Sequence, residues 1–250
     1  MGPNPEVPGY TASGLVRPGK RVAHAMTNID IQETIDAFAS DAKYCEEIGF
    51  DGVEIHGAHG YLIDNFLWSG TNDRDDNFGG SIESRSQLAA EITKAIRSNV
   101  SNNFIVGLRF SQWKQQDYQA RLADSPEELL KVLKEPCDAG LDYLHPSTRR
   151  FWESEFKNSE ETLAFWTKKL TNLQTMCVGS VGLDGEFTNM TAAANPVGID
   201  KAIQDINENK YDMVAVGRAL LSDHEWVIKM REGRIKDIIP YSEKALIEMY

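Results

Sequence analysis

The sequence predicts an α/β fold in which helices cover a parallel sheet. Short apolar runs, of the kind that form buried strands, alternate with longer segments whose apolar residues recur at helical spacing. Polar residues and glycines follow the apolar runs, and parallel α/β proteins bind ligands there, at the carboxyl ends of their strands. Both patterns indicate successive βα units.

Each unit can be placed along the chain. In the first expected helix, Ile31, Ile35 and Phe38 share one face and Gly49 ends the helix. Helices are expected over residues 28–49, 84–100, 126–139, 160–173 and 198–209, and strands over residues 50–56, 104–110, 141–145, 175–179 and 211–216. Five strands fit an open doubly wound sheet, whereas a closed (β/α)₈ barrel needs eight.

The expected domain organisation is an irregular segment over residues 1–27 followed by one domain over residues 28–250. Prolines and glycines break any periodicity in the first segment. The remaining length suits a single α/β domain.

Composition and charge exclude several classes of protein. With 26 basic and 38 acidic side chains the net charge is −12, which argues against nucleic acid and anionic membranes as partners. No apolar run approaches the roughly 18 residues that span a bilayer, and no signal peptide is recognisable. Cys45, Cys137 and Cys177 lack the spacing of a disulfide framework or a zinc site, so a cytoplasmic location is expected.

His56, His59 and Tyr61 form the most distinctive polar cluster, directly after the first expected strand. Two imidazoles three residues apart could bind a metal, but no third ligand with suitable spacing is present, so no metal is expected. The alternative is a polar clamp. Two imidazole N–H groups would hold one carbonyl or anionic oxygen, and the tyrosine would deliver a proton.

Three further strand ends carry candidate ligand-binding groups. Arg109 lies in the second apolar run, where it could form a structural ion pair or present a fixed cation to an electron-rich ligand. Gly179-Ser180 and Gly217-Arg218 follow the last two strands. Taken singly, each is an ordinary turn. Together they place backbone N–H groups and a guanidinium where barrels bind phosphate.

At these residues the chain resembles the Old Yellow Enzyme family of FMN-dependent NAD(P)H:flavin oxidoreductases. The resemblance runs through GFDGVEIHGAHGYLIDNFLWSGTNDRDDNFGGSIESR (residues 49–85), VGLRFS (106–111), VGSVG (178–182) and VAVGRALLSDHEW (214–226). It implies a (β/α)₈ barrel that binds FMN and uses NADH or NADPH as the reductant.

The resemblance also implies a role for each candidate. His56 and His59 would bind the substrate oxygen, Tyr61 would donate the proton, and Arg109 would lie beside the flavin. Gly179, Ser180, Gly217 and Arg218 would bind the FMN phosphate. The implied reaction is hydride transfer from reduced FMN to the β-carbon of an activated alkene, a small-molecule substrate. Asn72, Arg74, Asp76, Gly79 and Gly80 match a family signature that we interpret as structural.

One departure from the family limits these expectations. Three βα strands precede the histidine pair in the family, and residues 1–27 are too short and too rich in Pro and Gly to supply them. We therefore expect a partial barrel of about five of the eight βα units. The alternatives are a non-catalytic remnant, a half-barrel completed by another copy or chain, and a flavodoxin-like binding module on an open sheet.

Overall fold

A computed structural model of the chain describes residues 25–115, 117–186 and 192–247. Most of the segment expected to be irregular, residues 1–27, lies outside the described residues. The chain divides into two compact units, Met1–His145 with Leu170–Leu173, and Pro146–Lys169 with Gln174–Tyr250. The strands occur along the chain in the order β1 to β5; β1 pairs in parallel with β2, and β4 with β5.

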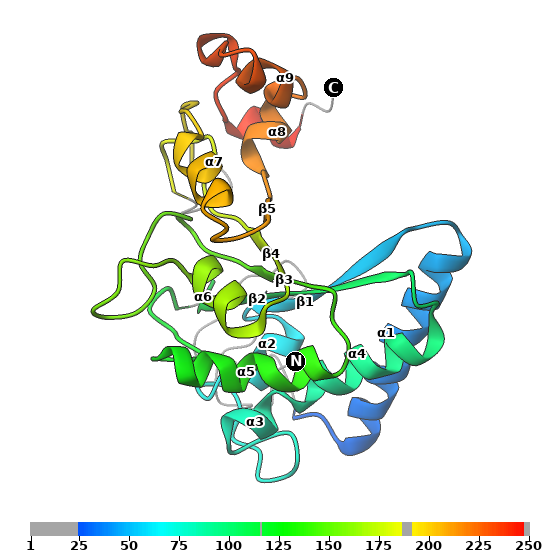
Figure 1. The fold of residues 1–250 in the computed structure, drawn as a ribbon. Coiled ribbons are helices and arrows are strands. Elements are labelled where there is room, and N and C mark those ends of the chain that lie inside the picture. The colour runs from blue at the N-terminus through cyan, green and yellow to red at the C-terminus, as the bar shows by residue number, and fades with distance from the viewer. Residues whose placement is uncertain (1–24, 116, 187–191, 248–250) are drawn as a thin grey trace. The chain divides into compact units, whose positions relative to one another are not determined.

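The first unit is built on two long parallel strands, β1 (Gly52–His59) and β2 (Ile105–Lys114), followed by β3 (Tyr143–Pro146). Helices α1 (Asn28–Glu47), α4 (Gln87–Asn99) and α5 (Pro126–Asp138) lie side by side (Figure 1). Two short helices, α2 (Leu62–Leu67) and α3 (Ile82–Arg85), follow β1.

Local signals fix where these helices begin. Thr27 caps α1 through a reciprocal pair of hydrogen bonds with Asp30, which satisfies N–H groups that the helix leaves open. Ser125 caps α5, and Pro126 occupies its first turn, where proline loses no helical hydrogen bond. The long helices therefore begin close to where the sequence predicts them.

Alternation along the strands separates an apolar face from a polar one. Ile55 on β1, Val106 and Leu108 on β2 and Leu144 on β3 are almost fully buried. The residues next to them, in the alternate positions of the same strands, include Glu54, His56, Arg109, Tyr143 and His145. Since successive strand residues point to opposite faces, these polar side chains share the other face of the sheet.

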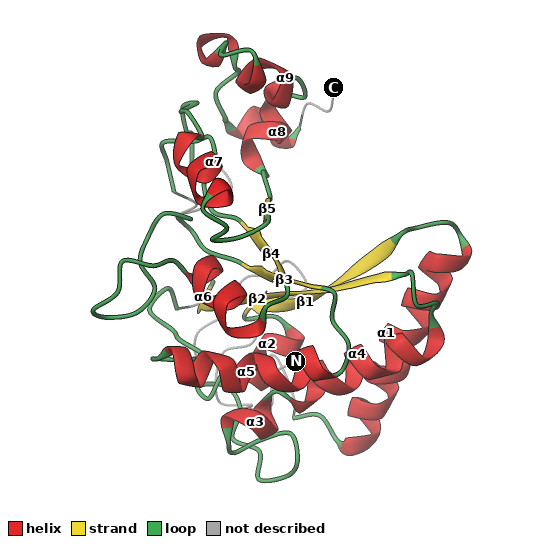
Figure 2. Cartoon of the chain, in the orientation of Figure 1, coloured by secondary structure: helices red, strands yellow, loops and turns green. Residues whose placement is uncertain are grey.

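The second unit contains α6 (Leu163–Thr171), β4 (Gln174–Cys177), α7 (Asp200–Asn207), β5 (Met213–Val214), α8 (Arg218–Ser222) and α9 (Trp226–Arg231), and two 3₁₀ turns, Ile235–Asp237 and Glu243–Leu246 (Figure 2). β4 and β5 are parallel, with Cys177 paired to Val214. One hydrophobic cluster forms around Trp226 and Tyr241, and another around Phe151 and Tyr211.

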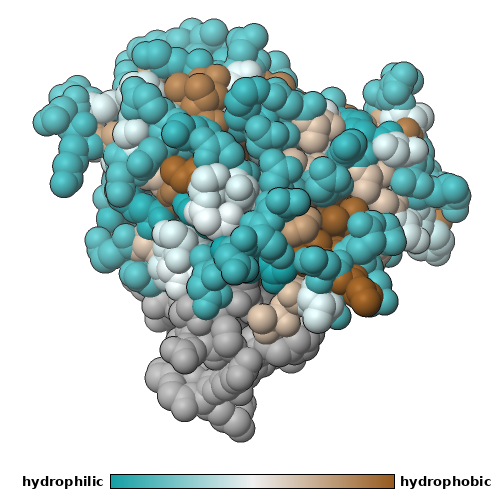
Figure 3. All heavy atoms as spheres, turned by 90° about the horizontal axis from the view of Figure 1, so that it is seen from below, coloured by the Kyte–Doolittle hydropathy of each residue, from teal (hydrophilic) through white to brown (hydrophobic). Residues whose placement is uncertain are grey.

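The predicted order of strands and helices is confirmed, with differences at their ends. β2 continues four residues beyond its expected end at residue 110, and β5 is only two residues long. The short helices α2, α8 and α9 are not predicted by the sequence pattern, and the helix expected over residues 84–100 is divided into α3 and α4. Hydrophilic residues dominate the face shown in Figure 3, and the hydrophobic ones are scattered. Within the described ranges, no helix has the length and apolar character needed to cross a membrane.

Candidate active site

β1 continues three residues beyond its expected end at residue 56, so that it includes both His56 and His59. The pairing with β2 continues past His56, which faces Arg109, and shifts its register between Gly57 and His59. His59 then adopts φ 63°, and Gly60 follows with φ 82°. A left-handed conformation is uncommon for a residue with a side chain, so this turn needs support from its surroundings.

The structure brings the three predicted catalytic side chains together. The ring centroid of His56 lies 5.2 Å from that of His59 and 5.3 Å from that of Tyr61. His59 is buried, with 9% of its surface exposed, whereas Tyr61 is 38% exposed. The cluster thus has one enclosed imidazole, with a phenol that solvent or a ligand can reach.

Both histidines are kept neutral. Burial, followed by the positive charge of Arg109, lowers the pKa of His59 from 6.5 to about 2. The same two causes lower the pKa of His56, although part of its ring reaches solvent. A neutral imidazole has one N–H donor, so the pair can hold an oxygen atom without adding a positive charge.

Arg109 is half-buried on the polar face of the sheet and has Glu54 as a nearby countercharge. Burial lowers the pKa of Arg109, and the negative charge of Glu54 opposes this shift. An arginine remains cationic even when partly desolvated. Both interpretations made from the sequence therefore stay open, since the guanidinium has an acidic neighbour and also lies opposite His56.

Glu54 is held by two side chains of β3. Its Oε2 accepts a hydrogen bond from the Tyr143 hydroxyl at 3.0 Å and lies 2.8 Å from Nδ1 of His145. Burial raises the pKa of Glu54, but the contacts with His145 and Tyr143 outweigh it and leave the pKa below its ordinary value. Tyr143 reaches Glu54 across Gly107, where a Cβ atom would lie 2.1 Å from the tyrosine ring.

The sequence pattern does not identify an aromatic wall beside His59. The Trp113 ring lies over the His59 ring with centroids 4.6 Å apart and planes tilted by 30°, and Tyr118 packs edge-on against Trp113 at 5.6 Å. These residues follow the predicted end of the second strand. The signal that could have found them is the tryptophan two residues beyond the polar end of an apolar run.

The loop that matches the family signature, residues 72–80, makes contacts within the protein, which agrees with its interpretation as structural. Nδ2 of Asn72 donates to the carbonyl oxygens of Phe66 and Phe78, at 2.6 and 2.7 Å. The Arg74 guanidinium forms a two-point pair with Asp76, with distances of 3.0 and 2.5 Å. A Cβ at Gly79 would lie 2.2 Å from the Arg74 carbonyl oxygen.

The second unit holds the predicted phosphate-binding residues. Gly179 and Ser180 adopt φ 141° and φ 52° in succession. Nη2 of Arg218 donates to Oγ of Ser180 at 3.0 Å and to the Gly185 carbonyl oxygen at 2.7 Å. The space around Gly217 is open, with no atom within 4 Å of where a Cβ would stand.

These residues fit a phosphate group chemically. A guanidinium beside a hydroxyl and a left-handed turn provides the donors that phosphate oxygens require. The predicted site residues thus form two groups, one in each unit, and each is described only within its own unit. Over residues 25–115, 117–186 and 192–247, no group of three or more His, Cys, Asp or Glu side chains could hold a metal ion.

Comparison with known proteins identifies relatives that cover between 56% and 88% of this chain. A probable NADH-dependent flavin oxidoreductase, YqiG of Bacillus subtilis (strain 168), is 32% identical over 224 residues, or 88% of this chain and 56% of that protein. An NADH oxidase of Thermoanaerobacter brockii is 33% identical over 85% of this chain and 31% of that protein. A probable inactive reductase, easA of Epichloe festucae var. lolii, is 36% identical over 56% of this chain and 37% of that protein.

The chain spans between about a third and somewhat over half of the length of these relatives, 31% to 56%. Residues 4–237 match the sequence model of the family described as NADH:flavin oxidoreductase / NADH oxidase. The parallel βα arrangement agrees with the barrel fold of that family, and the expected cofactor, FMN, is the cofactor that the family implies. The chain belongs to the NADH:flavin oxidoreductase / NADH oxidase family.

Proposed function

We propose that this chain is an FMN-dependent oxidoreductase that uses NADH or NADPH to reduce a small molecule, most simply an activated alkene. The observation that carries the proposal is the cluster of two neutral imidazoles and one accessible phenol beside a fixed guanidinium. In the proposed reaction, bound FMN supplies the hydride.

The residues of the first unit then act on the substrate. The N–H groups of His56 and His59 hold the carbonyl oxygen and stabilise the negative charge that develops on it. The Tyr61 hydroxyl, which is exposed enough to meet a ligand, protonates the α-carbon. Arg109 provides a positive charge beside the electron-rich flavin ring.

In the second unit we assign the FMN phosphate to Arg218, with Gly179, Ser180 and Gly217. The support is the guanidinium held against the Ser180 hydroxyl and the open space at Gly217. We further propose that the five strands form part of a (β/α)₈ barrel, as the resemblance implies.

A cytoplasmic location completes the proposal. It is supported by three free cysteines, Cys45, Cys137 and Cys177. Burial raises the pKa of Cys137 and of Cys177 to about 12, so neither thiol is suited to act as a nucleophile.

A second candidate is a non-catalytic chain, or one that completes its site with another copy or another chain. It is favoured by the similarity to a probable inactive reductase.

One experiment separates the two candidates. The purified chain is mixed with FMN and NADH or NADPH, a cyclic enone such as 2-cyclohexenone is added, and mass is followed by light scattering. A monomer with turnover supports the first candidate and contradicts the second. A chain that binds no FMN or associates strongly, and that shows no turnover, supports the second.

A further inference from the structure

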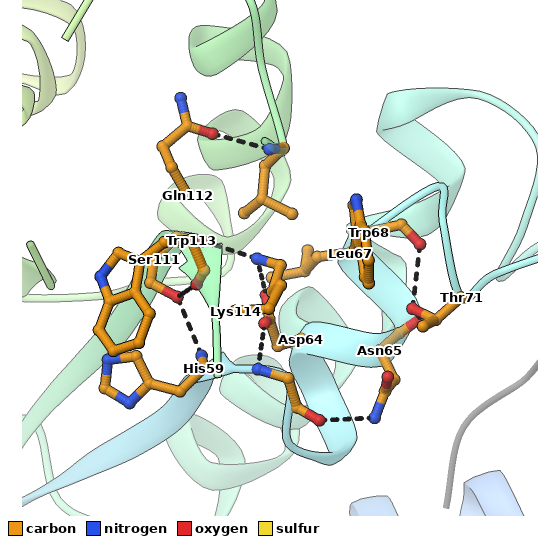
Figure 4. A network of polar contacts seen from close by, with 12 residues as sticks. His59, Asp64, Asn65, Leu67, Trp68, Thr71, Ser111, Gln112, Trp113 and Lys114 are labelled. Carbon is orange, nitrogen blue, oxygen red and sulfur yellow. Dashed lines mark hydrogen bonds and ion pairs between the residues drawn. The ribbon is translucent and has the colours of Figure 1, made fainter. Parts of the chain in front are cut away.

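A buried ion pair lies directly beneath the turn that carries His59 and Tyr61. Lys114 and Asp64 are both fully buried, with 0% of either side chain exposed, and Nζ of Lys114 lies 2.8 Å from Oδ1 of Asp64. Lys114 comes from the end of β2 and Asp64 from α2, 50 residues apart in the chain (Figure 4). Burying two charges is costly unless their remaining hydrogen-bonding groups are satisfied.

The pair is connected to the turn directly through Asp64 and indirectly through Ser111. The second carboxylate oxygen of Asp64 accepts the N–H of Gly60 at 2.5 Å, and Oγ of Ser111 accepts the N–H of His59 at 2.9 Å. The Lys114 ammonium joins these two supports, since it also donates to the Ser111 carbonyl oxygen at 2.9 Å. Two successive N–H groups of a left-handed turn are therefore held by Asp64 and Ser111, two residues that the Lys114 ammonium also contacts.

The network closes around the turn from the other side as well. Nδ2 of Asn65 donates to the Gly60 carbonyl oxygen at 2.9 Å, and Oγ1 of Thr71 donates to the Asn65 carbonyl oxygen at 2.9 Å (Figure 4). The Ser111 hydroxyl, having accepted from His59, donates to the Trp113 carbonyl oxygen at 2.7 Å. The same contacts thus fix the backbone of His59 and the start of the aromatic wall that covers its ring.

We propose that Ser111, Asp64 and Lys114 form a positioning network that holds the His59–Gly60–Tyr61 turn in its left-handed conformation and so sets where the His59 and Tyr61 side chains lie. The catalytic part of this inference rests on the proposed function, whereas the positioning part concerns the turn alone. None of the three residues needs to touch the substrate. Surface ion pairs contribute little to stability, and burying a pair adds a cost of desolvation. We therefore infer that this buried pair serves to hold the turn rather than to stabilise the fold as a whole.

The central test removes both charges together. Asp64→Asn/Lys114→Met leaves no uncompensated charge and keeps an oxygen that can accept the Gly60 N–H. The matched control is Lys134→Met/Asp138→Asn, which removes an exposed ion pair of the same residue types on α5. Thermal unfolding followed by circular dichroism establishes that each variant folds.

The readout is independent of catalysis. Amide hydrogen exchange of His59 and Gly60 is measured by NMR on the full chain, with the Ile55 amide of the same strand as an internal reference. We expect exchange at His59 and Gly60 to be about tenfold faster in the double variant, with Ile55 unchanged, because the ammonium no longer holds residues 64 and 111 in place and their hydrogen bonds to the turn weaken. The NOE between the rings of His59 and Trp113 should weaken. Uniformly faster exchange, or no change at His59 and Gly60, would overturn the proposal.

A second variant keeps the test decisive if the double variant does not fold. Ser111→Ala removes one hydroxyl and leaves both charges, and should accelerate exchange at His59 while leaving Gly60 unchanged. Unchanged exchange at His59 would overturn the proposal.

Kinetics separate this inference from the proposed function. In an active chain, Ser111→Ala should slow substrate reduction severalfold while flavin reduction by NADH keeps its rate. If the wild-type chain shows no turnover, the proposed function fails, but the exchange data still decide whether the network positions the turn.

Discussion

The imidazole of His59 lies under Trp113 and beside Arg109, and both neighbours act on its protonation. The indole helps to exclude water, and the guanidinium repels a second positive charge. A protonated His59 would have to be buried next to a cation, so the neutral form is favoured across the physiological range. This neutrality lets His59 donate a hydrogen bond whose strength does not vary with pH near neutrality.

The shift of the His59 pKa predicts how stability depends on pH. The folded pKa is about 2 and the ordinary value is 6.5, so between these values the unfolded chain binds the extra proton. Stability should therefore fall as pH drops below 6.5, by up to about 1.4 kcal/mol per pH unit from this residue. Above pH 6.5 the contribution is constant.

Urea unfolding of the wild type and of His59→Gln at pH 5, 6, 7 and 8 measures this dependence. The variant cannot titrate at this position and should lose less stability on acidification. The exposed His224→Gln serves as the control. Parallel curves for the wild type and His59→Gln would show that His59 is not held neutral.

Tyr61 provides the second prediction at this scale. Tyr61→Phe should slow reduction of an enone about 10²- to 10⁴-fold, because the proposed proton donor is lost. Flavin reduction by NADH should remain nearly intact. Stopped-flow measurement of the two half-reactions separates these effects. An unchanged oxidative half-reaction would remove Tyr61 from this role, and a collapse of the reductive half-reaction would place its effect elsewhere.

At the scale of elements, the approach of β1, β2 and β3 depends on Gly107. The Tyr143 ring crosses β2 at this position to reach Glu54 on β1. Because a Cβ would stand 2.1 Å from the ring, any larger residue must displace the tyrosine or spread the strands. The absence of a side chain on β2 thus allows a hydrogen bond between residues of β1 and β3.

Gly107→Ala should destabilise the fold by about 1–3 kcal/mol, as expected for overpacking. The same substitution made in Tyr143→Ala should cost much less, because the obstructing ring is gone. A double-mutant cycle in urea measures the coupling between the two positions. Equal costs in both backgrounds would show that the ring does not limit the packing at Gly107.

Much of this architecture can be predicted from the sequence, because apolar periodicity marks helices such as α1 and buried strands such as β1. The end of β2 cannot be predicted in this way, because Ser111 and Lys114 are polar residues and so interrupt the apolar run that marks a buried strand. Their partners, His59 and Asp64, lie about 50 residues away. Helix α2 is too short for a periodic signal, and helices of this length depend on tertiary contacts.

The candidate site shows the same limit. His56, His59 and Tyr61 can be chosen from their place near the end of an apolar run, and the structure brings their rings together. Glu54 and Trp113 carry no such signal. Their contacts depend on strand register and on a turn geometry that no local pattern specifies.

At the scale of the whole molecule, two compact units each contain part of the predicted site. Each unit contains buried hydrophobic residues and one predicted cationic group, Arg109 in the first and Arg218 in the second. The second unit offers the simpler test of ligand binding, because the group predicted to bind phosphate is a single guanidinium, that of Arg218, which donates to the Ser180 hydroxyl.

The claim that this chain itself carries a working FMN site is tested most directly by titrating FMN into the flavin-free protein and following the quenching of flavin fluorescence. We expect saturable binding that Arg218→Ala weakens about 10- to 100-fold, as for a lost charge-assisted contact to phosphate. Arg234→Ala, which removes an exposed arginine paired with Glu232 in the same unit, should bind FMN like the wild type. Absence of binding, or equal affinity in the wild type and Arg218→Ala, would contradict the account.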